Sequence, residues 1–265
     1  MNSTTKIFGC IADPIDHVKA PTLFTSEFHK RKIDAIMIPI HASKESLGEV
    51  INGLKKIKNF YGSTITIPHK VEILNYCDEL GVDAQETGAV NWLKFDKDKN
   101  KVIGNNFDGV GFVNGFKSND IDFEEKSICI FGAGGSAMAI AFALIKLNIK
   151  KLKIINRDFV RGKNLVHRLK KLYPNMNLSF ETLQNYNLSE SDIIINATSV
   201  GLKTSNKIPF DISLTKKNCL IVDIIMDPSE TLLIKEARKL KKQVLLGKFM
   251  LEGQLVYFGK YFKLW

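Results

Sequence analysis

The sequence of 265 residues has no apolar run as long as a membrane span, and its first residues lack the basic and then apolar pattern of a signal peptide. Its four cysteines are far apart, and three of them lie in apolar, strand-like stretches. That spacing offers no metal-type motif and suits reduced, buried thiols. We therefore expect a cytoplasmic protein that does not enter a membrane and holds no metal.

Acidic residues are fewer than basic ones: the chain has 28 against 38, which gives a formal net charge of +10. The lysines are spread through helix-like stretches such as "GLKKIKN" and "EARKLKKQ", where they form solvated faces. No basic block is interleaved with aromatic residues in the manner of single-strand binders. We expect no nucleic-acid partner, while the basic balance favours an anionic ligand.

The centre of the chain alternates short apolar, β-rich runs with helical ones. "SICIFG", "LKIINR", "DIIINATS" and "CLIVDII" read as strands, and "SAMAIAFALIKLN" and "TLLIKEARKLKK" read as helices. Strands that are apolar throughout and alternate with helices indicate a parallel sheet covered on both faces. The fold class is therefore α/β, with a doubly wound parallel sheet of the Rossmann type.

The first hundred residues alternate in the same way and predict a second α/β unit with its own sheet. The glycines and asparagines of "GNNFDGVG" mark the natural boundary. The C-terminal "MLEGQLVYFGKYFKLW" is too apolar for a free tail and is expected to pack as a helix. We assign 1–107 and 247–265 to a substrate-binding domain completed by the C-terminal helix, and 108–246 to a dinucleotide-binding domain.

"FGAGGSA", residues 131 to 137, follows a predicted strand and opens a predicted helix. Gly132 permits the tight turn, Gly134 lets backbone N–H groups reach a pyrophosphate, and Ala137 lets helix and strand pack closely. The alternative is an ordinary glycine-rich turn, but the context on both sides favours a dinucleotide. The expected cofactor-binding residues of this loop are Gly132, Ala133, Gly134, Gly135, Ser136 and Ala137.

The next strand ends in Asn156, Arg157 and Asp158, where the adenosine ribose is read. An acidic residue there selects NAD by accepting a ribose hydroxyl, whereas an arginine faces the 2′-phosphate of NADP. Arg157 and Arg161 could both bind a phosphate through their guanidinium groups. We favour NADP, and Asp158 keeps NAD possible.

The polar stretches "TITIPHK", "TGAVNW" and "NNFDGVG", followed by "GAGGSA", "NRD", "INATSVG" and "GKFMLEGQ", occur in an order that resembles the shikimate and quinate dehydrogenase family. The resemblance covers nearly the whole chain from Lys6. It implies an oxidoreductase that reduces 3-dehydroshikimate with NADPH, or runs in reverse. The implied partner is a small cyclic hydroxy acid, and we expect a monomer or a homodimer.

The resemblance also assigns roles to single residues. It makes Lys70 the catalytic lysine and Asp108 its partner, which fits chemistry in which a hydroxyl proton leaves as hydride is transferred. It places Thr66, Asn91 and Gln254 on the substrate, although a strand threonine, a strand-start asparagine and an exposed helix glutamine are the alternatives. The positions that surround the nicotinamide are Thr198, Val200, Gly247 and Met250, and the histidines read as structural.

The loop Pro14-Ile15-Asp16-His17-Val18-Lys19-Ala20-Pro21 departs from the family. The family typically has Pro-Ile-x-His-Ser-x-Ser-Pro, whose two serines bind the substrate carboxylate. Val18 and Ala20 replace those serines, Phe107 stands where a threonine is usual, and Met226 where a tyrosine is common. The substrate could therefore be quinate, an amino analogue of shikimate or another cyclic hydroxy acid. A nucleotide-binding sensor without turnover is the remaining alternative.

Overall fold

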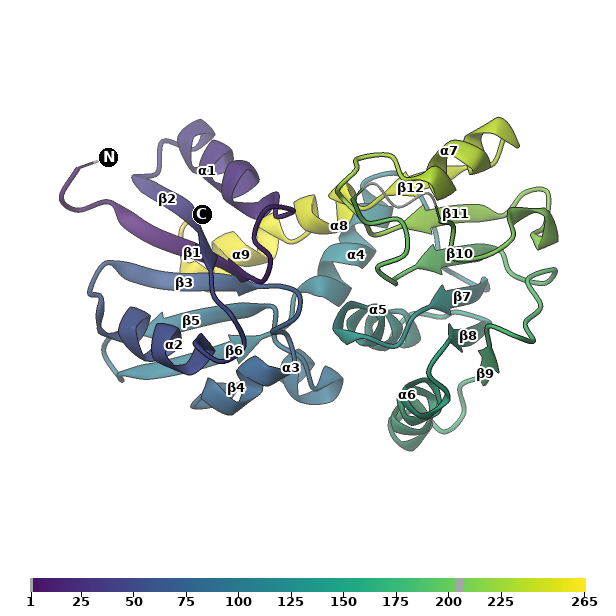
Figure 1. Cartoon of the computed structure of the whole chain (residues 1–265), viewed down its shortest axis with the longest axis horizontal. Helices are drawn as coiled ribbons and strands as arrows, with labels where there is room; N and C mark the ends of the chain where they lie inside the picture. Colours follow the sequence, from purple (N-terminus) through teal and green to yellow (C-terminus); the bar gives the residue numbers. More distant parts are fainter. Residues whose placement is uncertain (1, 204–206) are drawn as a thin grey trace. The chain divides into compact units, whose positions relative to one another are not determined.

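The computed structural model of the chain describes residues 2–203 and 207–265. The backbone divides into two compact units, 1–107 with 255–265 and 108–254 (Figure 1). The first junction falls between Phe107 and Asp108, inside the stretch that the sequence marks as a boundary. The segment 247–254 belongs to the second unit by its contacts, whereas the sequence interpretation grouped it with the first, because its short helix packs closely on the helix that begins at Asp108.

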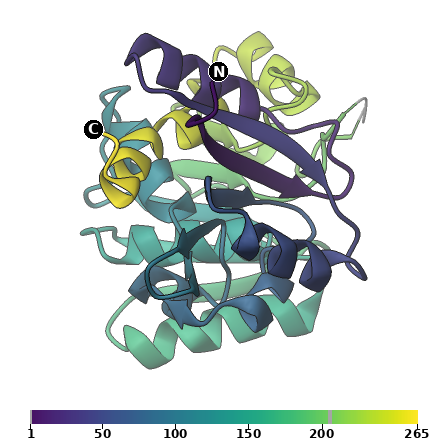
Figure 2. The ribbon, with the colours of Figure 1, turned by 90° about the vertical axis from the view of Figure 1, so that its left-hand side faces the viewer.

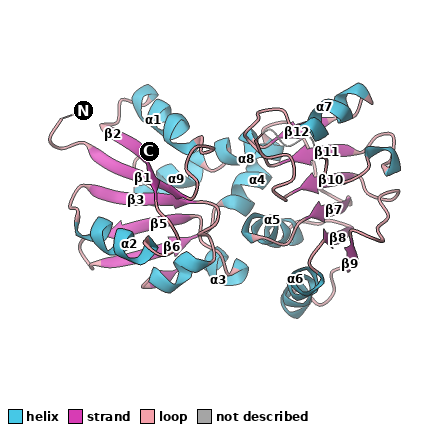
Figure 3. Cartoon of the chain, in the orientation of Figure 1, coloured by secondary structure: helices cyan, strands magenta, loops and turns pink. Residues whose placement is uncertain are grey.

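The first unit is built on a six-stranded mixed sheet in the order β2-β1-β3-β5-β6-β4 (Figures 1 and 3). Strands β1, β2 and β3 are parallel, whereas β5 runs antiparallel to both β3 and β6. The strands are β1 Lys6–Ala12, β2 Ala35–His41, β3 Phe60–Ile65, β4 Glu79–Leu80, β5 Trp92–Asp96 and β6 Lys101–Asn105. The helices are α1 Ala20–Lys30, α2 Leu47–Lys56, the 3₁₀ turn η1 Glu72–Tyr76, α3 Val82–Thr87 and α9 Leu255–Phe262.

An aromatic cluster holds the C-terminal helix α9 on the first unit. Phe258 is fully buried, and its ring centroid lies 4.7 Å from that of Phe24 and 4.7 Å from that of Trp92. Figure 2 shows α9 in yellow beside the purple N-terminal elements that it contacts. Buried aromatic side chains contribute much of a core's stability through their large area. The apolar C-terminal segment therefore completes the core of the first unit, although α8 precedes it in the second.

The second unit is a six-stranded, wholly parallel sheet in the order β12-β11-β10-β7-β8-β9. Its strands are β7 Ser127–Phe131, β8 Lys151–Asn156, β9 Leu178–Thr182, β10 Ile193–Asn196, β11 Leu220–Asp223 and β12 Val244–Leu246. Its helices are α4 Asp108–Lys117, α5 Gly135–Ile145, α6 Phe159–Leu172, η2 Ile212–Leu214, α7 Leu232–Lys239 and α8 Lys248–Glu252. Read from the opposite edge, the strand order is the 3-2-1-4-5-6 of the Rossmann fold. The predicted fold class is confirmed.

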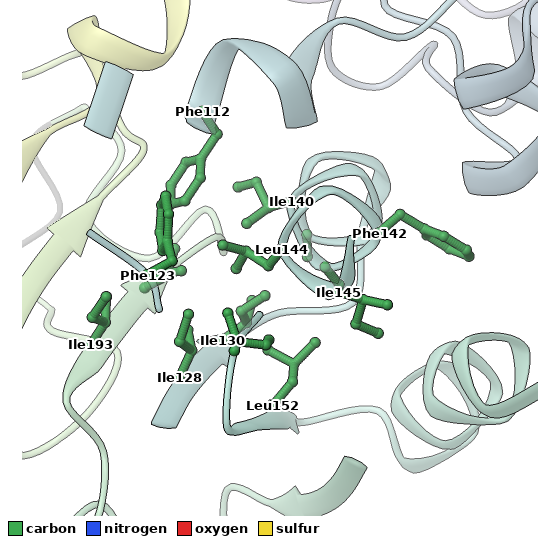
Figure 4. Close-up of a cluster of buried hydrophobic side chains, with 14 of the residues drawn as sticks. Phe112, Phe123, Ile128, Ile130, Ile140, Phe142, Leu144, Ile145, Leu152 and Ile193 are labelled. Atoms are coloured by element: carbon green, nitrogen blue, oxygen red, sulfur yellow. The ribbon is translucent and has the colours of Figure 1, made fainter. Parts of the chain in front are cut away.

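The main core of the second unit lies between its sheet and the helices α4 and α5. Phe112 of α4, Ile130 of β7 and Ile140 of α5 belong to one buried cluster (Figure 4). The apolar strands β7 and β10 are buried along their length because helices cover both faces of a parallel sheet. This core fixes the strand ends that carry the polar loops.

Among the described residues, no helix has the length and apolar character needed to cross a membrane. In the same part of the chain, no group of histidine, cysteine and acidic side chains could hold a metal ion. The four cysteines are free thiols, and Cys10, Cys129 and Cys219 are buried.

Candidate active site

Three predicted substrate-side residues converge at one edge of the first sheet. Thr66 follows β3, and its N–H donates to the carbonyl of Ile11 over 3.0 Å. The carbonyl of Lys70 accepts from Val90 N–H over 2.7 Å, directly before Asn91. Because β1 and β3 are parallel, their carboxyl ends meet at this edge. The structure thus brings Thr66, Lys70 and Asn91 onto adjoining segments.

A buried histidine anchors the turn that carries Lys70. His69 is fully buried, and its Nε2 lies 2.8 Å from the carbonyl oxygen of Ala42. The His69 N–H donates to the carbonyl of Thr66 over 2.9 Å. His69 therefore has the structural role that the sequence predicted.

The positive charge of Lys70 acts on the thiol of Cys10 in β1. Burial raises the pKa of the Cys10 thiol to about 11, and the neighbouring Thr64 hydroxyl and the Lys70 ammonium act in the opposite direction. Cys10 therefore stays a neutral thiol at physiological pH and is no candidate nucleophile.

The side-chain orientation of Asn91 is fixed by the segment before Asp108. Phe107 N–H donates to Asn91 Oδ1 over 2.7 Å, which leaves the amide NH₂ as the donor end. Asn106 Nδ2 donates to the carbonyl of Ala89 over 2.9 Å and ties the same two segments together. Asn106 was not predicted from the sequence, although the doublet Asn105-Asn106 in front of Asp108 is a signal that could have pointed to it.

Phe107 is a core residue of the first unit. It is 5% exposed, and its ring packs edge-on to Tyr261 with centroids 5.2 Å apart. Trp92 and Tyr257 complete its surroundings, with centroids 6.4 and 6.3 Å away. The side chain that replaces the family's threonine is therefore held in the aromatic cluster rather than presenting a polar group.

The loop between Pro14 and Pro21 presents no hydroxyl at its two altered positions. Ala20 is 6% exposed and begins α1, while Lys19 is exposed at the N-cap position of that helix. Val18 is half-buried. The nitrogens of His17 are buried and make no hydrogen bond with any described residue. Neither Val18 nor Ala20 can donate a hydrogen bond from its side chain to a carboxylate.

The glycine-rich loop of the second unit has the backbone that a pyrophosphate needs. Gly132 has φ 119°, and a Cβ there would lie 2.8 Å from the carbonyl oxygen of Ala197. Gly134 is the N-cap of α5 without a side-chain cap, and a Cβ on it would meet nothing within 4 Å. The space beside Gly134 is therefore open, and an anion is favoured at the N-terminus of a helix. The residues present fit a dinucleotide.

At the end of β8, Asp158 is the N-cap of α6. Its Oδ1 accepts from Arg161 N–H over 3.0 Å, and its Oδ2 lies 3.4 Å from Arg161 Nε. Its carboxylate therefore serves the helix terminus and one guanidinium. Asn156 Nδ2 donates to the carbonyl of Asp158 over 2.8 Å, and Arg157 is exposed. Of the two predicted phosphate ligands, Arg157 is presented to solvent and Arg161 is paired with Asp158.

A buried amide controls the loop of Thr198 and Val200. Asn196 is fully buried, its Oδ1 accepts from the N–H and the hydroxyl of Thr198, and its Nδ2 donates to the carbonyl of Val200 and to Asp223 Oδ1. A flipped amide would set its oxygen against two acceptors, so only one orientation is satisfied. Gly247 approaches this region so closely that a Cβ would collide with the carbonyl of Ile224.

Asp223 supports the same loop from β11. It is 1% exposed, and it accepts from Asn196 Nδ2 over 3.1 Å, Ile225 N–H over 3.1 Å and Thr231 Oγ1 over 2.6 Å. Burial raises its pKa to about 6, against the lowering effect of these donors. Asn196 and Asp223 were missed from the sequence, although each is the polar residue that ends an apolar parallel strand.

The predicted residues at the N-terminus of α4 form a hydrogen-bonded group. Asp108 is 3% exposed, and its Oδ1 accepts from Gln254 Nε2 over 3.2 Å. Gln254 is 4% exposed, which rules out the alternative of an exposed helix glutamine. Met226 is half-buried, and Met250 is partly buried against the main core.

Comparison with known families covers both units. Residues 10–93 match the model of the shikimate dehydrogenase substrate binding domain, and residues 116–229 match the shikimate / quinate 5-dehydrogenase model. A curated shikimate dehydrogenase (NADP(+)) of Methanococcus aeolicus is 35% identical over 268 residues, covering 100% of this chain and 93% of the relative.

Two solved structures are also similar to this chain over nearly its whole length. A shikimate dehydrogenase in complex with NADP+ is 31% identical and superimposes with a TM-score of 0.87, covering 96% of this chain and 88% of that chain. A ligand-free 5-ketofructose reductase of Gluconobacter is 27% identical with a TM-score of 0.83, covering 97% of this chain and 92% of that chain. The similarity therefore extends over both units.

Proposed function

Since the chain belongs to the shikimate dehydrogenase family, we propose that it is an NADP-dependent oxidoreductase that interconverts 3-dehydroshikimate and shikimate. The observation that carries the proposal is the convergence of Thr66, Lys70 and Asn91, from separate stretches of sequence, at one sheet edge. We further propose that it works in the cytoplasm as a monomer or a homodimer.

The proposed residues divide the chemistry between them. Bound NADPH would supply the hydride. Lys70 donates a proton to the oxygen on which negative charge develops, and it stabilises that charge electrostatically. Asp108 accepts a hydrogen bond from a second substrate hydroxyl, and the amide of Asn91 donates to the substrate from its fixed orientation. Thr66 and Gln254 add hydrogen bonds that orient the ring.

The main test follows NADPH oxidation with 3-dehydroshikimate, and NADP reduction with shikimate, quinate, an amino analogue and uncharged cyclic polyols. Rapid turnover of 3-dehydroshikimate supports the proposal. Turnover of another cyclic hydroxy acid in its place supports the second candidate, a paralogue with a shifted substrate, which Val18 and Ala20 favour. Cofactor binding without any turnover supports a nucleotide-binding sensor and contradicts both enzymatic candidates.

NADP should bind at least about tenfold more tightly than NAD, because Arg157 is presented where the 2′-phosphate is expected and a charge-assisted hydrogen bond contributes on the order of 1.5–3 kcal/mol. Calorimetric titration with both oxidised cofactors measures the ratio. Arg157→Ala should remove most of the preference, whereas Arg238→Ala, an exposed arginine paired with Glu230, should leave it unchanged. Equal affinities in the parent protein would mean that Asp158 controls the site.

Restoring the two loop hydroxyls should improve activity with shikimate. The double variant Val18→Ser with Ala20→Ser is expected to raise kcat/KM for shikimate by about tenfold, because each regained hydrogen bond to a carboxylate contributes on the order of 1.5–3 kcal/mol before losses to imperfect geometry. Val82→Ser, at a valine 69% exposed in the same unit, is the matched control. A folded double variant with no gain would show that these positions do not set specificity.

A further inference from the structure

We propose that Ser136 is a positioning residue that couples the cofactor loop to Asp108, so that seating of the dinucleotide orients the carboxylate. The inference deepens the proposed function and rests on it for the roles of Asp108 and the loop. It goes beyond the prediction that Ser136 binds the cofactor. In this proposal the hydroxyl of Ser136 acts on Asp108, which binds the substrate, rather than on the phosphates of the cofactor.

Each oxygen of the Asp108 carboxylate accepts a hydrogen bond from a side chain of the second unit. Ser136 Oγ donates to Oδ2 over 3.2 Å, and Gln254 Nε2 donates to Oδ1 over 3.2 Å. Asp108 is 3% exposed, so its charge depends on such donors more than a solvated carboxylate would. Loss of the Ser136 hydroxyl removes the donor that orients Oδ2 from the cofactor loop.

The position of Ser136 places this donor inside the cofactor loop. Ser136 is the second residue of α5, and Gly134, the N-cap of that helix, borders open space. Backbone N–H groups can therefore bind the pyrophosphate while the serine hydroxyl donates to Asp108. One turn of helix thus serves the cofactor through its backbone and Asp108 through a side chain.

Helix α4 packs closely against both α5 and α8. A Cβ at Gly109 would collide with the carbonyl of Ala139 on α5, and one at Gly111 would lie 2.6 Å from the carbonyl of Met250 on α8. Phe112 of α4 and Ile140 of α5 pack in the same core cluster (Figure 4). Because such interiors are dense and transmit small shifts, a cofactor that fixes the start of α5 also fixes the start of α4.

The coupling has a thermodynamic consequence. If bound NADP orders Ser136, and Ser136 orders Asp108, then NADP increases the affinity for substrate, and substrate increases the affinity for NADP by the same factor. A serine that served only the phosphates, or only its own helix terminus, would produce no such reciprocal effect through Asp108.

The experiment compares Ser136→Ala with Ser136→Thr, which keeps the hydroxyl, and with Ser118→Ala, at an exposed serine directly after the last residue of α4. We expect Ser136→Ala to lower kcat about tenfold, the effect of one hydrogen bond to a charged group, while the Kd for NADP changes less than about twofold. Ser136→Thr should recover most of the loss, and Ser118→Ala should match the parent. An unchanged kcat, or a loss confined to NADP affinity, overturns the proposal.

A second readout does not require turnover. The side-chain amide of Gln254 is hydrogen-bonded to Asp108 and can be followed by ¹H–¹⁵N NMR, with its signals identified by their loss in Gln254→Glu. NADP should shift these signals in the parent protein and in Ser136→Thr, and shift them far less in Ser136→Ala. Equal shifts in all three overturn the coupling. A parent protein that gives these shifts but turns over no substrate would refute the proposed function and leave the coupling supported.

Discussion

Replacing Lys70 with alanine is expected to lower kcat for the best substrate by about 10²–10⁴-fold, the contribution typical of a general acid–base group. The Kd for NADP should stay within about twofold, because Lys70 is proposed to act on the substrate proton, whereas the glycine-rich loop is proposed to bind the pyrophosphate. Steady-state assays and calorimetry measure the two quantities separately.

Lys58→Ala is the control for the Lys70 variant, since Lys58 is an exposed loop lysine of the same unit. It should retain parental kcat. Circular dichroism checks that both variants fold. If Lys70→Ala turns over its best substrate as fast as the parent protein, the catalytic role belongs to another residue, and the lysine of the motif "TITIPHK" is not catalytic.

The Rossmann half of the fold could be predicted because its signals are local. "ICIF" and "III" are apolar throughout, which is typical of strands buried on both faces, and Gly132 follows the first of them where a positive φ is needed. Helix α1 begins at Ala20, because Pro21 is well suited to the first turn of a helix. These features depend on residues close together in the chain.

The antiparallel part of the first sheet could not be predicted in the same way. Strands β5 and β6 have five residues each and mix apolar with polar side chains without a regular period, so their pairing depends on partners such as Gly62 opposite Lys94. The division of the C-terminal segment also depends on distant partners. Gly253 packs against Gly111 in the second unit, whereas Phe258 packs against Phe24 in the first.

The candidate site also has a part that local sequence predicts and a part that depends on distant contacts. The glycine loop and the motif residues were named from short stretches of sequence, but their hydrogen-bond partners were not. Ser136 reaches Asp108, and Asp223 reaches Asn196, across 28 and 27 positions of sequence. The first contact follows from the packing of α5 against α4, and the second from the pairing of β10 with β11. The sequence therefore indicates which residues are polar at strand ends, and the fold decides which of them meet.

Asp223 has a consequence for stability because it is both buried and ionisable. Burial raises its pKa from 3.8 to about 6, although Thr231, Ile225 N–H and Asn196 donate to it. Between these two values the folded state keeps the proton and the unfolded chain releases it, so a rise in pH favours unfolding. The contribution to stability is complete below the unfolded pKa of 3.8 and is lost as the pH rises through about 6.

Asp223→Asn should remove this pH dependence. Since a tenfold change in an equilibrium is about 1.4 kcal/mol, the free energy of unfolding of the parent protein relative to the variant should fall by about 2 kcal/mol between pH 4 and pH 7. Urea unfolding of both proteins at several pH values gives the difference, in which the other titrating groups cancel. Asp211→Asn is the control of opposite sign, because hydrogen bonds from Ser213 lower the pKa of that exposed carboxyl and its contribution grows with pH. A parent-minus-variant difference for Asp223 that stays flat, or that rises with pH, would show that the carboxylate in β11 is stabilised as an ion and that its three donors outweigh burial.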